Sequence, residues 1–138
     1  MSKFKPFLGS FDIDPTALKE ELDADDDALS QWSETTERGI SVAGYTHVRV
    51  WIVPIDATVT LHPVERVDLK YGDGLEETIW TQSTDLTGAA KDFPDVDTAL
   101  GGLLFNVAAA DRFAMRVESI EGADPSVKIA YRRFNLNA

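Results

Sequence analysis

The sequence predicts an all-β protein, an antiparallel β-sandwich of about eight strands with a jelly-roll-like arrangement. From about Ile40 to the C-terminus, apolar and polar residues alternate with the period of two that is typical of half-buried strands. The alternating segments are short and regularly spaced, and no long amphipathic helix separates them, which disfavours a parallel α/β sheet. With 138 residues, the chain has the usual length of one domain that buries its own core.

The first 38 residues do not follow this alternation. We expect residues 1–13 to form an extended arm, because Phe4, Phe7 and Phe11 are irregularly spaced and both a proline and a glycine interrupt the segment. The predicted organisation is therefore an arm over 1–13, a short helix with an acidic linker over 14–38, and the sandwich domain over 39–138.

The expected helix begins at Asp14 and Pro15, since an aspartate cap followed by proline in the first turn is a common helix start. Leu18 and Leu22 lie one helical turn apart and indicate its apolar side. We expect the helix to end in the acidic run 23–27.

The predicted strands follow from the alternation and from the turn residues between them. The first ends at Pro54, and Gly72-Asp73-Gly74 supplies the tight reversal of a hairpin between residues 66–71 and 77–82. Residues 84–101 are rich in Asp, Thr, Gly and Pro and predict a long loop, of the kind that often binds a ligand or partner. The strand that ends at Pro54 is expected to cover 48–52, and the other strands are expected at 57–61, 103–107, 113–120 and 127–134.

Charge and composition exclude several functions. The chain has 13 Lys and Arg against 24 Asp and Glu, a net charge of −11, so its surface repels nucleic acids and anionic lipids. With no cysteine, it has no disulfide, thiolate zinc site or cysteine nucleophile. No apolar run reaches the length of a signal peptide or membrane helix, and we expect a protein that is made and kept in a cytoplasm.

One acidic segment resembles a calcium-binding EF-hand loop. Asp23, Asp25, Asp27 and Glu34 occupy positions one, three, five and twelve of such a loop, but Ala28 stands where the sharp turn needs glycine. The sequence after Glu34 is also poor in helix formers. A solvated acidic linker is the favoured interpretation, and calcium binding here stays open.

A second acidic group lies in the predicted long loop. Asp92, Asp95 and Asp97 offer carboxylate oxygens within six residues, and the sequence alone leaves open whether they bind calcium.

No catalytic residues are predicted. The segment 39–43 has the glycine of a nucleophile elbow, but that motif requires a strand-to-helix turn in a parallel sheet. His47 and His62 are the only histidines, and each is expected to lie on the polar face of a strand. Among 24 acids, some pair lies at a glycosidase spacing by chance. We therefore expect a protein that is not an enzyme and that uses no cofactor.

The tryptophans suggest a different kind of site. Trp51 and Trp80 each lie opposite the aliphatic face of their predicted strand, where an indole ring either stacks on a sugar or packs in the core or an interface. A carbohydrate-binding β-sandwich module, with calcium held by an acidic loop, is therefore an alternative function.

Taken together, the helix-poor body from residues 44–50 onward, the terminal hairpin of residues 113–117 and 127–131, and the aromatic arm resemble one group of proteins. These are the small β-sandwich accessory proteins of tailed-phage particles, the capsid decoration or cement proteins. The resemblance is one of general style and covers about two thirds of the chain.

This resemblance implies a non-enzymatic virion protein that binds the major capsid (coat) protein and stabilises the particle, after assembly in the host cytoplasm. It also implies a homo-oligomer, with a trimer favoured, and no nucleic-acid or membrane partner. The expected partner-binding residues are Phe4, Phe7 and Phe11 of the arm, together with Trp51 and Trp80. An arm that folds back on its own sandwich is the alternative.

Overall fold

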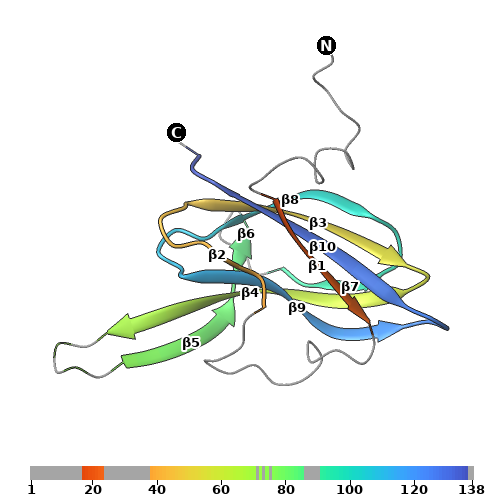
Figure 1. Ribbon diagram of the computed structural model, residues 1–138, viewed down its shortest axis with the longest axis horizontal. Coiled ribbons are helices and arrows are strands. Elements are labelled where there is room, and N and C mark those ends of the chain that lie inside the picture. Colours follow the sequence, from red (N-terminus) through yellow and green to blue (C-terminus); the bar gives the residue numbers. More distant parts are fainter. Residues whose placement is uncertain are drawn as a thin grey trace, which may run out of the picture.

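The fold is an antiparallel β-sandwich, which confirms the predicted fold class. The computed structural model describes residues 17–23, 38–70, 72, 74, 76–85 and 91–136. Within these ranges every regular element is a strand, and the strands form two sheets that pack face to face (Figure 1).

Among the described residues, each sheet contains five strands. The strands of sheet A lie in the order β1 (Ala17–Asp23), β10 (Ser126–Phe134), β3 (His47–Ile55), β8 (Leu100–Asn106) and β6 (Thr84–Asp85). In sheet B the order is β2 (Ile40–Ser41), β9 (Arg112–Glu121), β4 (Thr58–Lys70) and β5 (Glu76–Gln82), with β7 (Phe93–Val96) also paired to β4.

Within the described residues, the chain passes from one sheet to the other at six short connections. These join β2 to β3, β3 to β4, β5 to β6, β7 to β8, β8 to β9 and β9 to β10. Because β3 pairs with β10 while β4 pairs with β9, the folded ribbons β3–β4 and β9–β10 lie antiparallel across both sheets. This rolled connectivity gives the sandwich its jelly-roll-like character.

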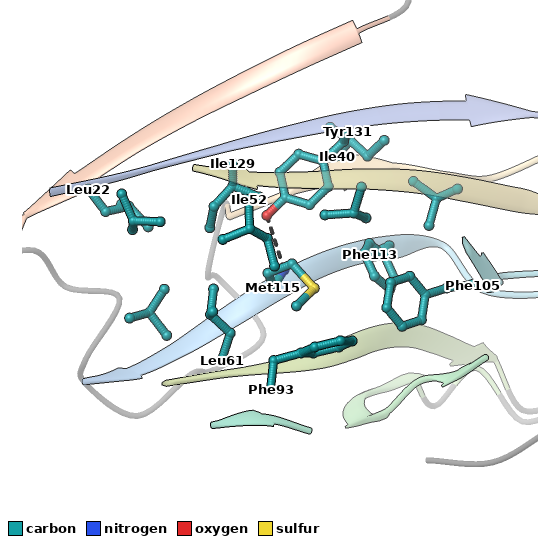
Figure 2. Packing of buried hydrophobic residues seen from close by; sticks show 14 of the residues in the cluster. Leu22, Ile40, Ile52, Leu61, Phe93, Phe105, Phe113, Met115, Ile129 and Tyr131 are labelled. Carbon is teal, nitrogen blue, oxygen red and sulfur yellow. Dashed lines mark hydrogen bonds between the residues drawn. The ribbon is translucent and has the colours of Figure 1, made fainter. Parts of the chain in front are cut away.

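The core fills the space between the sheets. Alternate residues of β3, β9 and β10 point inward, and four aromatic rings form a chain whose members come alternately from sheet B and sheet A (Figure 2). The Phe93 and Phe105 centroids are 6.2 Å apart, those of Phe105 and Phe113 5.2 Å, and those of Phe113 and Tyr131 6.1 Å. Each fully buried large apolar side chain contributes about 1.5–3 kcal/mol to folding, so this interior supplies the main stability.

The predicted short helix is not confirmed. Residues 17–23 form strand β1, which pairs along its length with β10, while Asp14 and Pro15 lie outside the described residues. A spacing of four residues places two side chains on the same side of a strand as well as on the same side of a helix. Leu22 is buried in the core because β10 supplies the hydrogen-bonding partner that the local sequence does not reveal.

Two prolines lie inside strands. Pro54 belongs to β3, although this strand was predicted to end there, and Pro63 lies within the thirteen residues of β4, between the predicted strands 57–61 and 66–71. The carbonyl of Pro63 accepts a hydrogen bond from Ser83 N at 2.9 Å. In an antiparallel strand, the N and the C=O of one residue point to the same side. The nitrogen of Pro63 therefore points to the side of β4 that β5 and β7 occupy, at a position where neither pairs with it, so no strand hydrogen bond is lost there.

The predicted long loop over 84–101 is only partly a loop. It contains β6 and β7 and the first residues of β8, while residues 86–90 lie outside the described residues. Strands of two and four residues are too short to give a recognisable alternation. The hairpin and the last three predicted strands are confirmed, as β4–β5 and as β8, β9 and β10.

Candidate functional site

The structure places the predicted partner-binding residues in separate regions. Phe4, Phe7 and Phe11 lie outside the described residues. Trp51 lies on β3 in sheet A, whereas Trp80 lies on β5 in sheet B. The two tryptophans therefore belong to two different surfaces and do not form one stacking platform.

Trp51 is on the outer face of sheet A, as its place in the alternation predicted. It packs with Ala130 in a small cluster separate from the main core, and its side chain is only 7% exposed. The guanidinium carbon of Arg49 lies 5.3 Å from the Trp51 ring centroid. A Cβ at Gly102 would approach Arg49 Nη2 to 2.9 Å, so a glycine here leaves room for the arginine. Little of the indole ring is open to a sugar in this arrangement.

Trp80 is half-buried and also has an arginine beside it. The guanidinium carbon of Arg66 is 5.9 Å from the Trp80 ring centroid, a distance typical of a cation–π contact. Arg66 Nε lies 3.1 Å from Asp68 Oδ1, and Thr78 Oγ1 donates to the same oxygen at 3.1 Å. This outer face of the β4–β5 hairpin is polar and held by side-chain contacts.

The β4–β5 hairpin extends beyond the body of the sandwich (Figure 1). Pairing of β4 with β9 ends where Arg66 meets Arg112, and the remaining residues of β4 pair with β5. At this point the Asp111 N–H donates to the Arg66 carbonyl at 2.9 Å, and Asp68 N donates to Asp111 Oδ2 at 2.8 Å. We call residues 67–70 and 76–79 the projecting ribbon, and Asp111 anchors its base.

One face of the projecting ribbon carries three apolar side chains, and Glu77 lies on the same face opposite Leu69. Val67 pairs with Ile79, and Leu69 follows two residues later on the same face. These three side chains are half-buried. Their face continues the inward-facing side of β4, which carries Leu61 in the core.

A buried ionic cluster joins the two sheets where β1 lies near residues 38 and 39. Glu20 Oε2 accepts hydrogen bonds from Arg38 Nε at 2.7 Å and from Gly39 N at 2.9 Å. Tyr131 donates its hydroxyl proton to Glu20 Oε1 at 2.6 Å and accepts from Met115 N at 3.0 Å. We call this set the Glu20 cluster, and the Tyr131–Met115 hydrogen bond across the core is drawn in Figure 2.

The pKa values of the Glu20 cluster follow from burial and hydrogen bonding. Burial raises the pKa of Glu20, but the hydrogen bonds from Arg38, Gly39 and Tyr131 outweigh it, so the net pKa is lowered. Burial, followed by the charge of Glu20, raises the pKa of Tyr131 well above its usual value. Glu20 is therefore an anion and Tyr131 a neutral donor, which suits a stabilising contact.

A second ionic cluster lies on the outer face of sheet B. His62 Nδ1 is 2.8 Å from Asp92 Oδ1, and His62 Nε2 is 2.7 Å from Glu118 Oε1. Gln82 Nε2 donates to the same Asp92 oxygen at 2.7 Å. Burial lowers the pKa of His62, but the two carboxylates outweigh it and the net pKa is raised. We call these four residues the His62 cluster.

The described residues contain no group of three or more potential ligands arranged to hold a metal ion. Of the EF-hand-like segment, only Asp23 is described, and it is the last residue of β1. In the second acidic group, the Asp92 carboxylate already contacts His62 and Gln82. Within the described chain, no helix is long and apolar enough to cross a membrane.

Sequence reasoning did not identify either ionic cluster. His62 was expected to be an ordinary polar-face residue, and its place on an outer face is correct, but its partners come 30 and 56 residues later. Glu20 and Tyr131 are separated by 111 residues. Only a prediction of strand register, pairing Glu20 with Ile129 beside Tyr131, would have found that contact.

Comparison of the chain with protein-family models, with curated proteins and with solved structures gives no match in any of the three.

Proposed function

We propose that this protein is a non-enzymatic structural component of a virus particle, a capsid decoration or cement protein that binds the coat protein and stabilises the particle. In this proposal the protein acts as a closed homo-oligomer, with a trimer favoured, and joins particles assembled in the host cytoplasm. The observation that carries its binding role is the projecting ribbon at one end of the sandwich.

A ribbon of two strands is only marginally stable in water when nothing packs against it. The ribbon here carries Val67, Leu69 and Ile79 on one face, and it extends past Arg112, the first residue of β9. Packing of this face against a neighbouring subunit or a coat protein would remove apolar surface from water, at roughly 25 cal/mol per Å². A contact of this kind favours a role in assembly.

Charge narrows the choice of partner. The net charge of −11 opposes binding to nucleic acid, so a protein surface on the outer side of a particle is the favoured partner. The aromatic residues Phe4, Phe7 and Phe11 would supply further apolar anchors to that partner. The sugar-binding alternative gains no support from Trp51, whose ring is nearly covered.

The test measures the mass of the purified full chain by light scattering over a range of concentrations. We expect a closed oligomer, and we expect Leu69→Lys combined with Ile79→Lys to shift it to monomer by placing charges on the apolar face. Thr78→Lys, on the opposite face of the same ribbon, is the matched control and should keep the oligomer. A variant that lacks residues 1–13 separates the contribution of the arm.

A wild-type chain that remains monomeric at all concentrations would overturn the oligomeric part of the proposal. If it also bound glycans on an array and melted at a higher temperature in calcium, the carbohydrate-binding module would replace the particle role. An oligomer that survives the double lysine variant would show that the ribbon is not the contact surface.

A further inference from the structure

The His62 cluster connects three segments that are distant in the sequence. His62 lies on β4, Glu118 on β9, and Asp92 directly before β7, while Gln82 at the end of β5 contacts Asp92. Strand β7 has four residues and pairs with β4 at two positions, Val59–Val96 and Leu61–Phe93. The cluster therefore holds the start of a very short strand.

The geometry of the cluster requires a protonated imidazole. Both ring nitrogens of His62 face carboxylate oxygens, at 2.8 and 2.7 Å, and an ionised carboxylate only accepts hydrogen bonds. A neutral imidazole carries one N–H, so it can donate to Asp92 or to Glu118 but not to both. The other nitrogen would then direct its lone pair at a carboxylate within 3 Å, which is unfavourable.

We propose that the His62 cluster is a pH-sensitive clamp, which fastens β7 to sheet B when His62 is protonated and releases it when His62 loses its proton. Release leaves Asp92 and Glu118 without the cation that they share, and their like charges then repel each other. Strand β7 is the element that responds, because its two pairings with β4 are few compared with the nine register pairs that hold β4 to β9.

The charged groups around His62 decide whether its protonated form is favoured or opposed. Arg116 of β9 lies opposite His62 in the sheet register and opposes its protonation, whereas Glu118 on the same strand favours it. Lys91 and Asp95 flank Asp92 on the segment that leads into and along β7, and the Lys91 ammonium lies 5.9 Å from the Phe93 ring centroid. The two carboxylates in direct contact outweigh Arg116, and the raised pKa of His62 agrees with this balance.

The direction of the pH dependence follows from the raised pKa of His62. The contacts of protonated His62 are complete below its ordinary pKa of 6.5, and they are lost as the pH rises through its higher value in the folded protein. The clamp is therefore closed in mildly acidic solution and open in alkaline solution.

The test is hydrogen exchange of the β7 backbone amides in the full chain at pH 5.5 and pH 8.5, corrected for the intrinsic effect of pH on exchange. We expect protection of Val96 and its neighbours to fall by roughly three- to tenfold at the higher pH, the size expected when one or two exposed charged contacts are lost. Amides of β9 and β10 should keep their protection and serve as the internal reference.

His62→Gln should remove the pH dependence of β7, and the chain offers a matched control. His47 is the other of the two histidines, and its Nδ1 contacts Thr46 Oγ1 at 2.7 Å, with no carboxylate among its described partners. His47→Gln should therefore leave the response of β7 intact. NMR titration of the wild-type His62 ring gives a second readout, and this ring should titrate above 6.5.

Equal β7 protection at the two pH values would overturn the proposal, and so would a pH response that persists in His62→Gln. A His62 ring that titrates below 6.5 would contradict the paired-carboxylate geometry itself. None of these outcomes depends on the mass of the oligomer, so the clamp and the proposed particle role can fail separately.

Discussion

The Glu20 and His62 clusters use similar chemistry in different surroundings. Glu20 is one carboxylate that accepts from a guanidinium, a backbone N–H and a phenol, and it is largely buried. His62 is one ring between two carboxylates, and the side chains of Asp92 and Glu118 are more than half exposed. The first cluster therefore joins the sheets wherever Glu20 is ionised, whereas the second depends on the proton of His62 and is weakened by water and salt.

Burial and the number of hydrogen-bond donors decide the role of an ionic cluster in this protein. In a buried cluster, loss of one partner leaves the remaining polar groups unsatisfied, which costs far more than the contact itself contributes. In an exposed cluster, water replaces the lost partner. Changes to the two clusters should therefore differ in size, in pH dependence and in salt dependence.

The largest effect is expected for Glu20→Ala. The change removes the acceptor of Arg38, Gly39 and Tyr131 at once, and it should lower the free energy of unfolding by about 2–4 kcal/mol. Urea unfolding at pH 7 measures this value. Glu21→Ala is the control, because Glu21 is the exposed neighbour on β1 and its loss should change stability by less than about 0.5 kcal/mol. Equal effects of the two changes would contradict the role assigned to Glu20.

A smaller effect is expected for Tyr131→Phe. The ring stays in the aromatic core, but the hydroxyl that donates to Glu20 and accepts from Met115 N is lost. We expect a cost of about 1–2 kcal/mol, because one buried carboxylate oxygen and one buried N–H lose a partner. Thermal unfolding at pH 7 tests this value. A stability equal to that of the wild type would show that water satisfies both groups.

Acid should weaken the Glu20 cluster. Because the pKa of Glu20 in the folded protein lies below its ordinary value of 4.5, its stabilising contribution is present above pH 4.5 and is lost as the pH falls through the lowered value. The stability difference between wild type and Glu20→Gln should therefore narrow between about pH 5 and pH 3. A constant difference would mean that ionisation of Glu20 does not contribute.

The smallest effect is expected for His62→Gln in global unfolding. At pH 5.5 the change should cost no more than about 1 kcal/mol, since two of the three charged groups are mostly exposed. Addition of about 1 M NaCl, which shortens the screening length to roughly 3 Å, should reduce this cost while leaving that of Glu20→Ala nearly unchanged. Equal salt sensitivity of the two variants would remove the distinction between the clusters.

The sequence predictions that were confirmed depend on local residue patterns, whereas those that were not depend on contacts between residues far apart in the sequence. Strands β9 and β10 have ten and nine residues, and their apolar and polar residues largely alternate. This pattern was enough to predict that they are strands and which side chains point inward. Strand β1 was mistaken for a helix because Leu18 and Leu22 fit either structure until β10 is placed beside them. Pro54 was expected to end a strand, and Pro63 lies between two strands that were predicted separately, but prolines are tolerated where an edge of the strand needs no donor.

The candidate sites show the same division. The sequence placed Trp51 and Trp80 on outer faces and His62 on a polar face, because alternation fixes which side of a strand a residue occupies. It did not show that Arg49 and Arg66 lie against the two tryptophans. The partners of His62 and Glu20 were also hidden, since those contacts depend on which strands become neighbours.

The β class of this protein, its β4–β5 hairpin and its net charge of −11 can be read from the amino-acid sequence. These are local or summed properties of the chain. The tertiary structure alone decided the order of the strands, the projecting ribbon and the two ionic clusters. Each of these depends on register between residues far apart in sequence, which only the packing of two sheets around one core can fix.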